Sequence, residues 1–192
     1  MNELLLIMAR APELGKVKTR LAKTLGEQRA LEVYKKLLEH TLNHAKESGY
    51  DSCVYVDGDP TYFKHREWNT EVQAIGDLGE KMKDAFSRSF ALGYTKVVMI
   101  GTDCYEINSE TISIAFSALS SCDVVLGPAL DGGYYLIGMK KMHLELFDSM
   151  PWSTSDLYTK TLDEARRFSL STHNLDIKSD IDEEKDLVGT DL

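Results

Sequence analysis

The chain has 192 residues, 43% of them hydrophobic and 28% charged, with a formal net charge of −9 and an isoelectric point near 5.0. This length favours a single domain over residues 1–192, and the acidic balance argues against nonspecific nucleic-acid binding, which needs a broad positive surface. The apolar start is too short for a signal peptide or a membrane span, and three cysteines without paired spacing are typical of reduced thiols. We therefore expect a cytoplasmic protein that binds neither nucleic acid nor membranes.

The first predicted element is a buried strand over residues 4–8, and an unusually basic segment follows it. Pro12 and Gly15 interrupt regular structure there and expose backbone N–H groups. This segment, residues 10–23, holds five of the 22 basic residues of the chain: Arg10, Lys16, Lys18, Arg20 and Lys23. A cationic loop between a strand and a helix is a common phosphate site, although a solvated basic loop has the same composition. A small anionic ligand fits this local charge better than a polymer does.

Alternating helix and strand patterns continue after the basic segment. They predict a helix over residues 27–48, a strand over 52–56 and a second strand over 72–75. Asp77 then begins a helix that runs to Gly93, because Glu80 follows it at the spacing of a capping box. Gly79 lies in the first turn of this helix and is a candidate for binding nucleotide phosphate.

The second half of the chain repeats the alternation. It predicts a strand over residues 96–100, a helix over 109–119 capped by Ser109, strands over 124–126 and 134–139, a helix over 154–168 and a weak strand over 170–177. Strands that alternate with helices predict a three-layer α/β/α sandwich with a mostly parallel sheet. Ligands of such sheets bind beyond the carboxyl ends of the strands, so the residues that follow each strand are the candidates for function.

Carboxylates are the first such candidates. Asp103 follows the apolar strand 96–100, where it can hold a hard divalent cation or simply cap a turn. The tail contains Asp180, Asp182 and Asp186, and Asp182 can supply a second carboxylate to a metal ion shared with Asp103. A charge-rich tail is also often just solvated.

A second candidate is the sequence Gly-Pro-Ala-Leu-Asp-Gly-Gly-Tyr-Tyr after the strand 124–126. Asp131 can accept a hydrogen bond or act as a base, Gly132 and Gly133 permit close backbone approach, and Tyr134 offers a stacking surface. The same Asp-Gly-Gly also suits a plain hairpin turn. Trp152 is a candidate for stacking on a sugar, with packing in the core as the alternative.

Six segments together resemble a bacterial family called DUF2064. They are GKVKTRLA, GDLGEKM, GTDC, GPALDGGYYLIG, WSTSD and DIDEEKDL. Proteins of this family are described as glycosyltransferases with radical SAM and selenium-domain neighbours, some of them in arsenosugar biosynthesis. The resemblance covers nearly the whole chain and implies the nucleotide-diphospho-sugar transferase fold. GT-A glycosyltransferases share this fold with nucleotidyltransferases such as 2-phospho-lactate guanylyltransferase.

The resemblance also implies roles for single residues. The residues that match the loop around the nucleotide's phosphates are Arg10, Lys16, Lys18 and Arg20. Asp103 matches the carboxylate that binds the divalent metal, and Asp182 matches a later carboxylate that often completes that site. Two positions depart from the family: Tyr105 stands where Pro is usual, and Glu183-Glu184 stands where Thr-Pro is usual.

These features predict a glycosyltransferase that depends on Mg²⁺ or Mn²⁺ and uses a nucleotide sugar and a small-molecule acceptor. Lys18 would stabilise charge on phosphate oxygens, and Asp131 would orient or deprotonate the acceptor hydroxyl. One alternative is a nucleotidyltransferase that takes a nucleoside triphosphate and releases pyrophosphate. The other is a nucleotide-binding module without turnover. The sequence does not predict the nucleotide base, the sugar, the acceptor or the oligomeric state, nor whether Asp180 replaces Asp182 at the metal.

Overall fold

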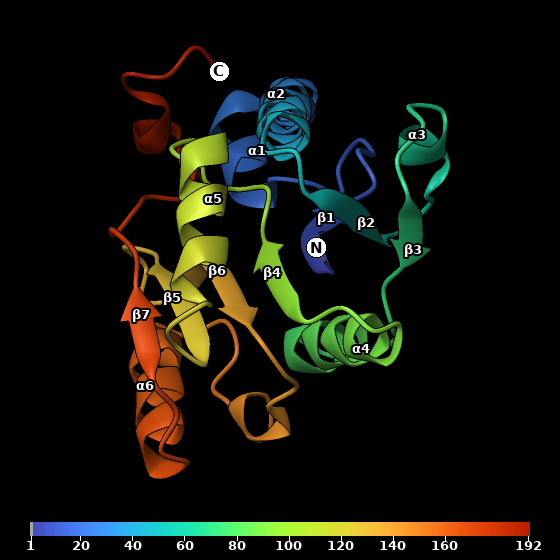
Figure 1. The fold of residues 1–192 in the computed structure, drawn as a ribbon. Helices are drawn as coiled ribbons and strands as arrows, with labels where there is room; N and C mark the ends of the chain where they lie inside the picture. The colour runs from blue at the N-terminus through green and yellow to red at the C-terminus, as the bar shows by residue number, and fades with distance from the viewer. Residues whose placement is uncertain (1) are drawn as a thin grey trace.

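A seven-stranded sheet forms the centre of the molecule, and helices cover both of its faces (Figure 1). The computed structural model describes residues 2–192. The strand order is β3-β2-β1-β4-β6-β5-β7, and all neighbours are parallel except β6, which runs antiparallel to β4 and β5. The predicted three-layer α/β fold with a mostly parallel sheet is therefore confirmed.

The helices and strands follow the predicted alternation. The strands are β1 (Glu3–Arg10), β2 (Asp51–Asp57), β3 (Thr70–Val72), β4 (Lys96–Ile100), β5 (Val124–Pro128), β6 (Tyr134–Met139) and β7 (Thr172–Asn174). The helices are α1 (Thr19–Leu25), α2 (Glu27–Glu47), α3 (Thr61–Lys64), α4 (Leu78–Ala91), α5 (Ser109–Ala118) and α6 (Leu157–Arg167), with short 3₁₀ turns η1 (Leu144–Leu146) and η2 (Glu184–Leu187).

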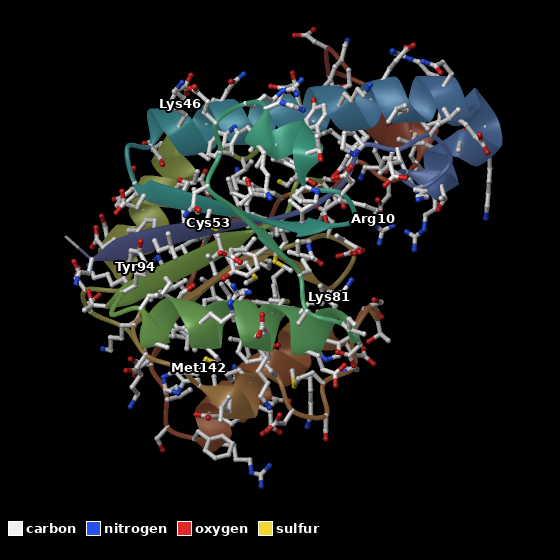
Figure 2. The ribbon with its side chains drawn as sticks, turned by 90° about the vertical axis from the view of Figure 1, so that its right-hand side faces the viewer. Arg10, Lys46, Cys53, Lys81, Tyr94 and Met142 are labelled. Carbon is white, nitrogen blue, oxygen red and sulfur yellow. The ribbon has the colours of Figure 1, made fainter. Side chains whose placement is uncertain are left out.

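Side chains of the sheet alternate between two hydrophobic cores. In β1, Leu5 and Ile7 pack in the core that contains α2 and α5, whereas Leu4 and Leu6 pack in the core that contains α4 and α6. Figure 2 shows α2 and α4 on opposite sides of the strands. Each fully buried Leu or Ile contributes roughly 1.5–3 kcal/mol of transfer free energy, which fixes the register of the central strands.

Several boundaries differ from the sequence prediction, and β3 covers residues 70–72 rather than 72–75. The helix α5 is capped by Asn108 rather than Ser109, because the Asn108 side chain accepts a hydrogen bond from the Thr111 backbone N–H at 2.8 Å. The helix α6 begins only at Leu157, since residues 151–156 form turns, and β7 is limited to three residues. The capping box of Asp77 at the start of α4 is present as predicted.

The topology brings the predicted functional segments to one edge of the sheet. The strands β1, β4, β5 and β7 all end there, and β6 starts there because it is antiparallel. The tail after β7 then crosses back to β4, where Asp180 forms a β-bridge with Cys104 and the Ile181 N–H donates to the Asp103 carbonyl at 2.8 Å. This crossing places the tail carboxylates beside Asp103.

The three cysteines are buried, and none is part of a disulfide. Burial raises the pKa of the Cys53 thiol to about 11 and that of the Cys104 thiol to about 12, so both stay protonated near neutral pH. Among residues 2–192, no helix is long and apolar enough to cross a bilayer.

Candidate active site

A cleft of about 830 Å³ lies at the carboxyl edge of the sheet. Its walls come from the ends of β1 and β4, from the basic segment, from the β5–β6 connection and from the tail. The structure brings eight of the predicted site residues to this cleft: Arg10, Lys18, Arg20, Asp103, Asp131, Gly133, Tyr134 and Asp182. Residues as far apart in the sequence as Lys18 and Asp182, which are 164 positions apart, therefore meet at the cleft.

Lys18 lies at the centre of the acidic wall. Its side chain is only 5% exposed, and its Nζ lies 2.6 Å from Asp103 Oδ1 and 3.3 Å from Asp182 Oδ1. The same nitrogen donates to the Ile181 carbonyl at 2.6 Å. The Lys18 backbone is left-handed, with φ 46° and ψ 47°, directly before α1. A non-glycine residue takes this conformation only where the surrounding structure imposes it.

Two more carboxylates lie close to this cluster. Burial, followed by the negative charges of Asp103 and Asp131, raises the pKa of Asp180 to about 7, while the Lys18 ammonium acts in the opposite direction. Arg20 adds an exposed guanidinium, whose Nη1 lies 3.1 Å from Asp182 Oδ2. Carboxylates thus outnumber cationic groups on this wall, so the wall attracts an additional cation.

A second group of lining residues, called here the cationic wall, contains Arg10 and Lys81. The Arg10 guanidinium lies 3.4 Å from Asp57 Oδ2, and its Nη1 donates to the Lys16 carbonyl at 3.2 Å. The Tyr34 hydroxyl accepts from the Arg10 N–H and donates to its carbonyl, which fixes the end of β1; burial raises the pKa of Tyr34 to about 12. Lys81 Nζ also pairs with Asp57, at 3.2 Å. Figure 2 shows Arg10 and Lys81 at the same end of the strands.

Comparison with known proteins identifies the family. The family described as "Uncharacterized protein conserved in bacteria (DUF2064)" matches residues 41–154. The chain belongs to the DUF2064 family. A solved structure from Desulfovibrio desulfuricans G20, described as a "putative nucleotide-diphospho-sugar transferase", is 33% identical with a TM-score of 0.93 and covers 97% of this chain and 84% of that chain. No curated protein matches the DUF2064 chain in sequence.

Two more distant structures share the fold of this DUF2064 protein. CMP:2-keto-3-deoxy-manno-octonic acid synthetase in complex with CTP is 9% identical with a TM-score of 0.64, over 96% of this chain and 95% of that chain. Rv0371c from Mycobacterium tuberculosis H37Rv, in complex with manganese, is 13% identical with a TM-score of 0.63, over 97% and 96%. These identities show the shared fold alone.

The acidic wall of the DUF2064 protein suits a hard divalent cation. Carboxylate oxygens are preferred ligands of Mg²⁺ and Mn²⁺, and Mg²⁺ commonly takes only one or two of them, completing its shell with phosphate and water. Residues 2–192 contain no group of three or more His, Cys, Asp and Glu side chains arranged to hold a metal ion. Asp103 and Asp182 fit as the one or two protein ligands, with the Lys18 ammonium between them.

Sequence reasoning missed several polar residues of the cleft, among them Lys81 and Gln73. Lys81 follows the capping box within the motif GDLGEKM, so its place one turn into α4 was a usable signal. Gln73 follows the edge strand β3, and its amide nitrogen donates to the carbonyls of Ala9 and Tyr55 at 3.2 and 2.9 Å. Because both amide hydrogens are used, the side-chain oxygen of Gln73 remains as an acceptor. The weak pattern around β3 gave no comparable signal.

Four predicted residues do not line the cleft: Lys16, Gly79, Gly132 and Trp152. The Lys16 side chain is exposed and pairs with Glu13 at 2.5 Å. Gly79 is buried under the Trp152 indole, where a Cβ would collide with the ring. Trp152 in turn stacks on Phe147, with ring centroids 6.3 Å apart. Gly79 and Trp152 therefore pack the core next to the site, in agreement with the packing alternative for Trp152.

The Asp-Gly-Gly-Tyr segment forms the connection between β5 and β6. Gly132, with φ 89°, lies against the Ser155 carbonyl, and a side chain there would collide with it. Asp131 Oδ1 accepts from the Gly133 N–H at 2.8 Å, which holds the carboxylate at the mouth of the cleft. The Tyr134 hydroxyl is buried without a hydrogen-bond partner in the described part of the chain, and Tyr134 is also among the residues that line the cleft.

Proposed function

We propose that this protein is a divalent-metal-dependent glycosyltransferase that acts in the cytoplasm as one domain, with a nucleotide sugar as donor and a small molecule as acceptor. The observation that supports this proposal is the cleft itself, which is lined by the cationic side chains of Arg10 and Arg20 together with the carboxylates Asp103 and Asp182. The 33% identity to the Desulfovibrio protein with its nucleotide-diphospho-sugar transferase description supports the same class.

Each side chain then has a role that its position allows. Arg10, Lys18 and Arg20 bind the phosphates, where negative charge grows as the nucleoside diphosphate departs. Asp103 and Asp182 hold the metal ion, with Asp180 beside them; bound Mg²⁺ or Mn²⁺ supplies positive charge to the phosphate oxygens of the leaving group.

The acceptor side of the cleft is built around Asp131. One of its carboxylate oxygens is held by the Gly133 N–H, and the other is available to orient or deprotonate an acceptor hydroxyl. Gly133 and Tyr134 line this side, and Gly132 keeps the loop against Ser155. The acceptor is therefore proposed to bind between β6 and the cationic wall.

Nucleotidyl transfer is the second candidate. The observation that favours it is the fold shared with the CTP-bound synthetase over 96% of this chain. In that reaction the same cations would bind a triphosphate, and pyrophosphate would leave. A nucleotide-binding module without turnover is the third possibility.

The test begins with thermal unfolding in a panel of nucleotides and nucleotide sugars, with and without Mg²⁺ or Mn²⁺. A ligand present at a hundred times its Kd stabilises the native state by about 2.7 kcal/mol, so a true ligand shifts Tm clearly. Product analysis then separates the candidates. Nucleoside diphosphate released from a nucleotide sugar supports glycosyl transfer. Pyrophosphate released from a nucleoside triphosphate with a phosphorylated acceptor overturns it, and binding without any turnover supports the module.

A further inference from the structure

The Lys18 ammonium occupies the place that a cation shared by Asp103 and Asp182 would take. Its Nζ lies 2.6 Å from one carboxylate and 3.3 Å from the other, and the side chain is almost fully buried. We propose that Lys18 is a tethered cation that competes with the divalent metal for these two carboxylates, so that metal binding displaces its ammonium. The inference rests on the metal site of the proposed function.

The hydrogen bonds of Lys18 make its two possible roles exclusive. An ammonium has three N–H donors, and the oxygens of Asp103, Asp182 and Ile181 account for all three. Lys18 therefore has no donor left for a phosphate while it stays among the carboxylates. The ammonium can reach a phosphate in the cleft only after another cation has replaced it at Asp103 and Asp182.

The surrounding charges set the direction of the expected effect. Asp180 forms a β-bridge with Cys104, next to Asp103, and Asp131 lines the same cleft, so both add to the negative potential there. Without the Lys18 charge, Arg20 is the remaining ion-pair partner of Asp182, and its side chain is 68% exposed. Removing the ammonium should therefore strengthen the binding of an added divalent ion. If Lys18 instead served to position the carboxylates for the metal, its removal would weaken that binding.

The experiment is a titration of the ligand-free protein with Mn²⁺, in which free Mn²⁺ is measured by electron paramagnetic resonance and no nucleotide is present. Lys18→Met removes the charge and keeps the length of the side chain. Lys23→Met is the matched control, because Lys23 is exposed in α1 and does not line the cleft. We expect Lys18→Met to bind Mn²⁺ at least about tenfold more tightly than the natural protein, and Lys23→Met to bind as the natural protein does.

The shift of Tm on addition of Mn²⁺ is a second measure of binding, which is needed if Lys18→Met is unstable. In both Lys18→Met and Lys18→Gln, Mn²⁺ should raise Tm more than it does in the natural protein. Equal or weaker Mn²⁺ binding by the Lys18 variants overturns the proposal, and so does the absence of Mn²⁺ binding in all of them. Tighter Mn²⁺ binding by the Lys18 variants, together with no turnover of any donor by the natural protein, would leave this inference standing and refute the proposed transferase activity, so the two failures are distinguishable.

Discussion

The carboxylates at the two edges of the sheet have different surroundings. At the carboxyl edge, Asp103 and Asp182 share the single buried ammonium of Lys18, with Asp131 and Asp180 close by. At the amino edge, the acidic groups Glu3 and Asp123 each have a partner of their own. Glu3 pairs with Lys96 at 3.0 Å, and Asp123 pairs with Lys140 at 3.2 Å while also accepting hydrogen bonds from the Ser171 N–H and hydroxyl.

The pKa values of two aspartates express this difference. Hydrogen bonds from Ser171 hold the pKa of Asp123 well below its usual range, whereas burial and neighbouring carboxylates raise the pKa of Asp180 to about 7. The amino edge therefore gains stability from its charges. At the carboxyl edge, unbalanced negative charge lowers the stability of the fold. This is the pattern expected where a ligand completes the site. Replacing one Asp by Asn in each setting tests this contrast.

Asp103→Asn should have the largest effect. It removes the carboxylate that contacts Lys18 and that we assign to the metal, so we expect the transfer rate to fall by about 10² to 10³. Turnover would be measured with the donor found by the nucleotide screen, and circular dichroism would check folding. Asp163→Asn is the control, because Asp163 lies on the exposed face of α6 and pairs only with Arg166. Full activity of Asp103→Asn would contradict the assignment.

Asp180→Asn should stabilise the protein, and only at higher pH. The pKa of Asp180 is raised above that of the unfolded chain, so folding becomes less favourable as pH rises from about 4 through 7. The variant does not have this loss. Its free energy of unfolding should exceed that of the natural protein by about 1 to 3 kcal/mol at pH 8, and by little at pH 4. Urea unfolding in EDTA at both pH values measures the gain. A gain that does not depend on pH would show that the charge cluster is not its cause.

The sequence predicted that the site residues would lie together, because their meeting follows from the topology of the sheet. The apolar runs 4–8 and 96–100 predicted two central parallel strands, and parallel strands end at the same edge. Arg10 and Asp103 had to lie near each other for that reason. The capping box at Asp77 was equally local, since it depends on two side chains three residues apart.

The remainder depends on tertiary contacts that local patterns do not encode. The tail carboxylates reach Asp103 through the bridge between Cys104 and Asp180, and nothing in the tail sequence specifies that pairing. Whether Trp152 faced a sugar or the core depended on Gly79, a residue 73 positions away whose missing side chain makes room for the indole. The cap of α5 moved from Ser109 to its neighbour Asn108, because adjacent polar residues offer the same hydrogen bond.

Asp123→Asn should have the smallest effect of the three, with the opposite sign to Asp180→Asn. The pKa of Asp123 is lowered in the folded state, so its contribution is present above the pKa of the unfolded chain and is lost as pH falls. We expect the free energy of unfolding to fall by about 1 kcal/mol at pH 7, because Asn replaces charged hydrogen bonds to Ser171 with neutral ones. This difference should disappear toward acid pH. Activity should not change, since Asp123 lies at the edge away from the cleft. The same unfolding experiment measures both variants, and a shift of the same sign in both would refute charge balance as the difference between the two edges.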